Sequence, residues 1–213
     1  IPLAKLPVGT YQVKLALQDA MGKEIAAATD SLRKLEPKTH EVKIDRIKRI
    51  ILVNGDPFFV YAPLQCFGVH SASPYGNYDD YVEKVIRYWA DSGFKTLMVG
   101  ANVGSDWGKW SERIWDQVFK SASVHGIKVV AFWTANVIKD LEEDEKRLRL
   151  ENLIVRWREE PALLAWLPID EPEINTYKPP SVARFIGRVR ELDPYHPVFI
   201  NYTQMGPDSR YAG

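Results

Sequence analysis

The sequence predicts an α/β protein in which antiparallel strands precede a sheet of parallel strands. Before Tyr61, apolar residues mostly alternate with polar ones, as they do in strands with one buried face. From Tyr61 onward, short apolar runs alternate with segments whose apolar residues recur at helical spacing. Such a succession of strands and helices is typical of a parallel sheet whose strands are connected by helices.

The first predicted element is a β-hairpin. Apolar residues alternate with polar or small ones over residues 11–17, and Gly22 lies in a turn before a second alternating run at residues 25–29. An isolated hairpin is only marginally stable. We therefore expect residues 1–45 to be the C-terminal part of a β-sandwich whose earlier strands precede Ile1.

A second hairpin is predicted after a short linker. Residues 42–45 alternate as a strand does, and apolar runs at residues 50–53 and 58–61 flank Asn54 and Gly55. An Asn-Gly pair between two such runs is the strongest short-range signal for a hairpin. We expect the second domain, residues 46–213, to begin with this hairpin.

Strands and helices then alternate along the chain. Apolar residues at helical spacing after Asp79 and Asp80, with Gly93 as the C-terminal cap, predict the first helix. The charged run at residues 141–160 predicts a helix with one solvated face, which Pro161 ends. The expected parallel strands cover residues 59–67, 96–101, 128–134, 163–169 and 198–202.

The number of strands distinguishes two architectures. A closed α/β barrel has eight strands and spans about 250 residues. No glycine-rich phosphate loop of the doubly wound type follows the first strand, at residues 65–70. We therefore expect a TIM-type (β/α) barrel that is truncated after about five βα units. An open α/β sheet that is complete in this chain is the alternative.

Composition and charge narrow the functional classes. The 28 Lys and Arg residues balance 28 Asp and Glu residues, which disfavours binding to nucleic acid or to an anionic membrane. No apolar run approaches the ~20 residues of a membrane-spanning helix. Cys66 is the only cysteine, which excludes an internal disulfide and a cysteine-based metal cluster. No cofactor or metal is expected, and localisation and oligomeric state stay open.

The most informative motif is an apolar run that ends in acids. Residues 163–167 are apolar, and Asp170, Glu171 and Glu173 follow, with Pro172 among them. Catalytic groups of α/β barrels lie where buried strands end, which makes Glu171 the first candidate for a catalytic residue. Acids followed by proline are also favoured at a helix N-terminus, so a structural role is the alternative.

Other polar and aromatic side chains fall at or just beyond the ends of predicted strands, where a barrel binds its substrate. We predict substrate-binding residues at Asp170, His70, Asn102, Trp133, Asn136, Asn201 and Tyr202. Each of them could instead cap a helix or close a loop.

The order of these motifs resembles the glycoside hydrolases of clan A, and in particular the family 2-like enzymes. The resemblance rests on residues 42–45, 53–59, 161–166, 170–172 and 192–198. It implies a (β/α)8 barrel preceded by an immunoglobulin-like β-sandwich. In this clan the glutamate that ends the fourth barrel strand is the general acid/base, which corresponds to Glu171. The clan usually has Asn before that glutamate, whereas this chain has Asp170.

The resemblance also implies a reaction, the hydrolysis of O-glycosidic bonds by a retaining mechanism, with an oligosaccharide or glycoside as the partner. One carboxyl protonates the leaving oxygen and a second one acts as nucleophile. Neighbouring Asp170 and Glu171 are not expected to form this pair, because side chains alternate along a strand. The clan's nucleophile ends the seventh strand, which is expected beyond Gly213.

We therefore expect the isolated chain to be an inactive part of a glycosidase that carries the acid/base half of the site. A non-catalytic carbohydrate-binding protein on the same fold is the alternative, because a fold does not determine a function. The sugar, the linkage and exo or endo action depend on loops and on strands outside this sequence.

Overall fold

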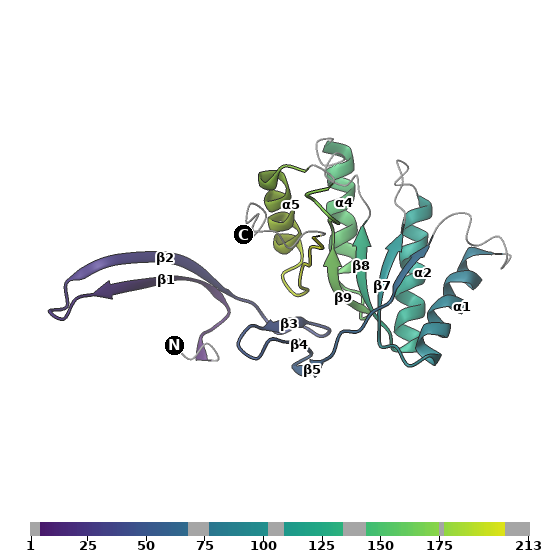
Figure 1. Cartoon of the computed structure of the whole chain (residues 1–213), viewed down its shortest axis with the longest axis horizontal. Helices are drawn as coiled ribbons and strands as arrows, with labels where there is room; N and C mark the ends of the chain where they lie inside the picture. Colours follow the sequence, from purple (N-terminus) through teal and green to yellow (C-terminus); the bar gives the residue numbers. More distant parts are fainter. Residues whose placement is uncertain (1–4, 68–76, 102–108, 134–143, 175–176, 203–213) are drawn as a thin grey trace. The chain divides into compact units, whose positions relative to one another are not determined.

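The computed structural model describes residues 5–67, 77–101, 109–133, 144–174 and 177–202 (Figure 1). The chain divides into two compact units, Ile1–Lys38 and Thr39–Gly213. Within the described ranges, no helix is long and apolar enough to cross a membrane.

The first unit contains a β-hairpin. Strands β1 (Gly9–Gln18) and β2 (Glu24–Lys34) pair in antiparallel fashion. In the turn between them, Asp19 Oδ1 accepts hydrogen bonds from the main-chain N–H groups of Met21 and Lys23. The predicted alternation therefore does produce two paired strands.

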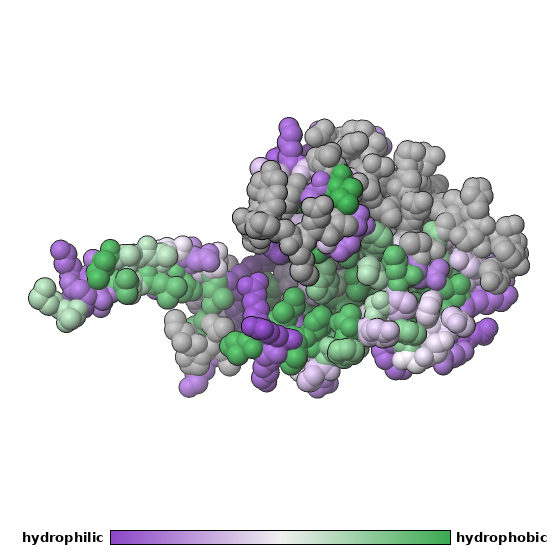
Figure 2. Space-filling view, viewed as in Figure 1, coloured by the Kyte–Doolittle hydropathy of each residue, from purple (hydrophilic) through white to green (hydrophobic). Residues whose placement is uncertain are grey.

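The two faces of this hairpin differ in polarity. Leu15 lies opposite Ala28 on one face, whereas Lys14 lies on the other face with its ammonium 2.7 Å from the Glu24 carboxylate. Leu15 and Leu17 are 71% and 62% exposed, and Figure 2 shows apolar residues along the hairpin. The described part of the chain thus leaves an apolar hairpin face open to solvent.

The second unit begins with a three-stranded antiparallel sheet of β3 (Val42–Asp45), β4 (Ile50–Val53) and β5 (Asp56–Phe58). The turn from β4 to β5 lies at Asn54 and Gly55, whose φ angles are 53° and 92°. Two successive positive φ angles are typical of the type I′ turn, whose twist suits a hairpin. The predicted second hairpin is confirmed.

The main sheet is parallel, and its strands are neighbours in chain order. They are β6 (Leu64–Phe67), β7 (Thr96–Ala101), β8 (Lys128–Trp133) and β9 (Leu163–Leu167). The segment at residues 198–201 continues the sheet, because parallel bridges join Trp166 to Val198 and Asp170 to Asn201. The predicted parallel sheet is confirmed.

The first parallel strand is shorter than the sequence predicts. Paired residues of β6 begin at Leu64 and not at residue 59. Phe58 still belongs to the antiparallel sheet, and Pro63 has no N–H to donate to a neighbouring strand. The apolar run at residues 58–61 therefore connects the two sheets.

The described helices connect the parallel strands. They are α1 (Tyr78–Asp91), α2 (Lys109–His125), α4 (Asp144–Trp157) and α5 (Pro179–Leu192). The Asn77 side chain caps α1 by accepting a hydrogen bond from the Asp80 N–H (2.8 Å), and Gly93 follows the helix with a φ of 89°. Pro179 starts α5, where its fixed φ favours a helix and its missing N–H is not needed.

All these helices lie on one face of the parallel sheet (Figure 1). One buried cluster contains side chains from every one of them, among them Val82, Phe119, Ile154 and Phe185. A separate cluster joins the opposite face of the sheet to residues of the antiparallel sheet, such as Ile51 and Phe58. Neighbouring Val129 and Val130 of β8 belong to different clusters, as alternation along a strand requires.

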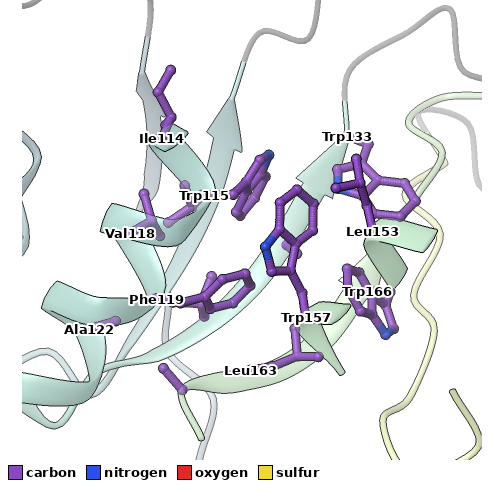
Figure 3. Packing of buried hydrophobic residues seen from close by; sticks show 14 of the residues in the cluster. Ile114, Trp115, Val118, Phe119, Ala122, Trp133, Leu153, Trp157, Leu163 and Trp166 are labelled. Atoms are coloured by element: carbon purple, nitrogen blue, oxygen red, sulfur yellow. The ribbon is translucent and has the colours of Figure 1, made fainter. Parts of the chain in front are cut away.

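Aromatic side chains fill the layer between α2, α4 and the sheet (Figure 3). Trp115 and Trp157 are fully buried with ring centroids 5.8 Å apart, and Phe119 packs against both. Trp157 Nε1 donates a hydrogen bond to the Asp116 carboxylate (3.1 Å). The predicted inward face of the charged helix is confirmed by the burial of Leu150, Leu153, Ile154 and Trp157.

Candidate active site

The acidic motif lies at the carboxyl end of β9, the fourth strand of the parallel sheet. Every residue of β9 is buried, and Pro168 and Ile169 are buried as well. Asp170 and Glu171 are the first partly exposed residues beyond the strand. In sheets of this kind, ligands bind at the carboxyl edge of the strands.

The pairing at this edge contains one extra residue. The chain advances four residues from Trp166 to Asp170, while its neighbour advances three from Val198 to Asn201, and each pair forms a parallel bridge. Unequal counts of this kind define a bulge, which re-aims the side chains that follow it and is frequent next to active sites.

Glu171 has an unusual main-chain conformation. Its φ is 43°, in the left-handed region that residues with a β-carbon rarely adopt. The Glu171 N–H donates to the Asn201 carbonyl oxygen (3.0 Å), and the Glu171 carbonyl accepts from the Ile174 N–H (3.1 Å). Residues 172–174 form a turn and α5 begins only at Pro179, so the expected alternative of a helix N-terminus at Glu171 does not apply.

Asn201 is brought directly against the acidic motif. Its side-chain Nδ2 donates a hydrogen bond to Asp170 Oδ1 (2.9 Å), and Tyr202 follows it in the chain with a half-buried side chain. Four of the predicted site residues, Asp170, Glu171, Asn201 and Tyr202, are therefore neighbours at one edge of the sheet.

Of the remaining predicted residues, only Trp133 lies in the described ranges. Trp133 is fully buried, and its ring packs against that of Trp166 with centroids 5.2 Å apart on the helical side of the sheet (Figure 3). His70, Asn102 and Asn136 lie outside the described residues. The described site thus consists of polar side chains from the β9 end and from the strand next to it.

A buried polar group beside β9 was not predicted from the sequence. Asp193 Oδ2 accepts hydrogen bonds from Trp166 Nε1 (2.7 Å) and from His196 Nδ1 (2.8 Å), and both Asp193 and His196 are buried. His196 Nε2 lies 3.2 Å from the His40 carbonyl oxygen. The spacing of Asp193 and His196 around Pro194 is the only sequence signal for this group.

Titratable groups with perturbed pKa values occur at the opposite edge of the sheet. Burial lowers the pKa of Lys128, at the start of β8, and its ammonium donates to the Pro161 carbonyl (2.6 Å). Burial, reinforced by the charge of Asp116, raises the pKa of Glu160, shortly before β9. Perturbed pKa values often mark functional sites, but they also accompany structural burial. The position of Glu171 at the carboxyl end of β9 favours that edge of the sheet as the candidate active site.

A hollow of about 310 Å³ also lies at that opposite edge. Its lining residues precede β6 and β7, and they are Phe59, Tyr61, Ser92, Gly93, Phe94 and Lys95. Since the amino and carboxyl ends of parallel strands are at opposite edges of a sheet, this hollow and Glu171 cannot share a ligand. In the described ranges, no three His, Cys, Asp or Glu side chains come together as metal ligands.

Comparison with known proteins gives structural relatives only. No protein-family model matches the chain, and no curated protein does. A family 5 glycoside hydrolase mannosidase from Rhizomucor miehei superposes with a TM-score of 0.63 at 12% sequence identity, over 81% of this chain and 59% of that chain. This chain therefore spans less than two thirds of the mannosidase.

Two bacterial enzymes give similar results. A family 2 glycosyl hydrolase from Bacteroides cellulosilyticus has a TM-score of 0.54 at 15% identity, over 95% of this chain and 26% of that chain. A family 5 glycoside hydrolase from Bacteroides vulgatus has a TM-score of 0.53 at 16% identity, over 77% of this chain and 40% of that chain. The chain thus has a glycosidase-like fold, of the kind found in clan A glycoside hydrolases.

Proposed function

We propose that this chain is part of a retaining glycoside hydrolase, family 2-like within clan A, in which Glu171 is the general acid/base. The observation that carries the proposal is the position of Glu171. It follows the fourth strand of a parallel sheet, immediately beyond a fully buried run, and its main chain has a left-handed φ of 43°. Unfavourable backbone conformations of this kind cluster at active sites.

The layering of the second unit supports a closed barrel. The helices share one buried cluster, and strands follow one another in chain order. A doubly wound sheet would have helices on both faces. In a closed (β/α)8 barrel, the antiparallel sheet that packs on the other face would cover the barrel interior, and further strands beyond Gly213 would complete the cylinder.

The open apolar face of the β1–β2 hairpin supports the expected β-sandwich. A sandwich buries one face of each sheet against the other, while the second face stays polar. Leu15 on the apolar face and Lys14 on the polar one fit this division. We propose that residues 1–45 complete an immunoglobulin-like domain with strands that precede Ile1.

In the proposed reaction, Glu171 protonates the leaving oxygen and later activates water. A retaining enzyme needs a second carboxyl about 5 Å away as nucleophile, and we propose that this residue lies beyond Gly213. We propose that Asp170 is not the nucleophile, because it is next to Glu171 in the chain and the side chains of neighbouring strand residues point in different directions. The isolated chain therefore supplies one of the two carboxyls.

A carbohydrate is the proposed partner. A variant of the Rhizomucor miehei mannosidase has been solved in complex with mannosyl-fructose, which shows a sugar bound by a protein of this fold. We propose that Tyr202, His70, Asn102 and Asn136 contribute to the sugar pocket, since all of them follow strand ends.

The test is a kinetic comparison in the full-length enzyme. Glu171→Ala should slow hydrolysis of a glycoside with a poor leaving group about 10²- to 10⁴-fold, while an activated aryl glycoside, whose leaving group needs no proton, is affected far less in the first step. Azide should rescue the variant, because a small anion attacks the glycosyl intermediate without base assistance. Glu173→Ala, two residues away, is the matched control. Equal losses on both substrates without azide rescue would contradict the assignment.

Asp170 provides the reason to keep a second candidate function, a non-catalytic carbohydrate-binding protein. This residue differs from the Asn that the clan usually has before its acid/base. The full-length sequence distinguishes the two functions, since a glutamate at the end of a seventh strand is required only by the enzyme.

A further inference from the structure

Asn201 makes two contacts with two successive residues of the acidic motif. Its carbonyl oxygen accepts the Glu171 N–H (3.0 Å), and its side-chain Nδ2 donates to Asp170 Oδ1 (2.9 Å). The first contact holds the main chain of Glu171, and the second holds the side chain of the residue before it. One residue of the neighbouring strand thus fixes both ends of the Asp170–Glu171 peptide unit.

Local sequence preferences oppose the conformation that Glu171 adopts. A residue with a β-carbon disfavours a φ of 43°, and a residue followed by proline is driven toward extended conformations. Glu171 precedes Pro172. An unfavourable conformation persists only when tertiary contacts determine it, and Asn201 supplies a main-chain contact to Glu171 from the neighbouring strand.

We infer that Asn201 is a positioning residue for Glu171 and that Asp170 is its anchor, not a ligand of the substrate. This inference rests on the proposed role of Glu171. A general acid must be held within a fraction of an ångström of its productive position, and a 1 Å displacement can cost about 10²-fold in rate. The Asn201 side chain, which donates a hydrogen bond to Asp170, supplies that support.

The contact itself is tested in this chain by thermal unfolding, without any assay of activity. Asn201→Ala removes the hydrogen bond and should lower the unfolding midpoint by about 2–4 °C at every pH. Asn201→Asp instead places a second carboxylate against Asp170. Two carboxylates at this distance repel each other when both are ionised. The pKa of one of them is therefore raised above its unfolded value of about 3.9.

The sign of the pH effect follows from that raised pKa. The folded Asn201→Asp variant binds more protons than its unfolded form, so its stability rises as the pH falls. The unfolding midpoint of the variant should therefore lie furthest below that of the wild type near pH 8, and this difference should be smaller by about 2–4 °C near pH 5. Asn152→Asp, at an exposed position of α4, is the matched control and should show no such recovery.

Positioning is tested in the full-length enzyme. Asn201→Ala should lower kcat for a poor leaving group about 10- to 100-fold, with KM changed less than about two-fold, because substrate binding does not use Asn201. As the pH is lowered, the activity of Asn201→Asp relative to the wild type should rise, whereas that of Asn201→Ala should not. If Asn201 had only a structural role, its substitution would change stability, but kcat would neither fall in this way nor recover at acidic pH.

The two proposals fail in different ways. An Asn201→Asp variant whose stability follows the wild type at all pH values overturns the inference, even if Glu171 proves essential. A rise in KM with kcat unchanged also overturns it, because Asn201 or Asp170 would then bind substrate. If Glu171→Ala retains full activity, the proposed function fails, while the pH-dependent stability of Asn201→Asp still reports the contact.

Discussion

Glu171 illustrates how a single residue can oppose stability. Its left-handed φ crowds the β-carbon against the backbone at a cost of roughly 1–2 kcal/mol, which glycine would not incur. Sites of this kind are kept where the direction of a side chain matters more than stability.

We predict that Glu171→Gly is more stable than Glu171→Ala by about 1 kcal/mol, because both lack the carboxyl but only alanine keeps the crowding. Urea unfolding of this chain measures the difference. The same pair of substitutions at Gln12, inside strand β1, should give the opposite order, since glycine weakens a regular strand. Equal stability of the two Glu171 variants would mean that the turn relaxes freely.

The buried Asp193 carboxylate leads to a second prediction. Asp193→Ala should destabilise the chain by about 3–5 kcal/mol, because it leaves the Trp166 N–H and the His196 ring without their shared acceptor. Denaturant unfolding checks this value. Glu191→Ala, an exposed neighbour at the end of α5, should change stability by less than about 1 kcal/mol. A similarly small loss at Asp193 would show that water replaces the carboxylate.

At the scale of secondary-structure elements, ion pairs join successive helices. Arg113 of α2 contacts Asp79 of α1 (2.7 Å). Arg149 of α4 contacts Glu112 of α2 (2.6 Å), and the next pair along, Arg188 and Glu151, joins α5 to α4 (2.8 Å). Each helix pair is therefore held at its surface as well as through the core.

The Arg188–Glu151 pair should make stability depend on pH. The hydrogen bond from Arg188 lowers the pKa of Glu151 against the opposing effect of burial. A depressed pKa stabilises the fold above the unfolded value of about 4.3, and this contribution is lost as the pH falls through the folded pKa. Arg188→Ala should thus cost about 0.5–1 kcal/mol at pH 7, since the arginine is half exposed, and less near pH ~3.

Urea titrations of wild type and variant at both pH values measure this effect. Arg184→Ala, at an exposed position of the same helix, is the control and should lack the pH dependence. A cost for Arg188→Ala that is the same at pH 7 and pH ~3 would assign the loss to the packing of the arginine stem.

Elements with strong local signals were predictable from the sequence. The Asn54-Gly55 turn and the inward face of α4 depend on neighbouring residues only, and both are confirmed. The sequence predicts too early a start for β6, because an apolar run that connects two sheets has the same composition as a strand. The Asn201 contacts could not be predicted, since they join residues 30 and 31 positions apart at a bulge.

At the scale of the whole molecule, the proposed site is divided between this chain and residues beyond it. We predict that the isolated chain has no glycosidase activity, because the proposed mechanism places the nucleophile outside it. Assays with aryl glycosides check this. Turnover by the isolated chain that Glu171→Gln abolishes would show that both carboxyls lie within these residues.

The extra residue between Trp166 and Asp170 has an evolutionary consequence. If the segment paired regularly onward from Trp166 and Val198, Ile169 and not Asp170 would lie opposite Asn201, and the side chain of Glu171 would turn to the opposite side. Such a change straightens the bulge and removes neither the carboxylate nor a buried residue of β9. In a glycosidase of the proposed kind, substitutions that straighten the bulge would therefore abolish catalysis while the glutamate persists in the sequence, so the pairing of this segment is as informative about descendants of this fold as the identity of its acid.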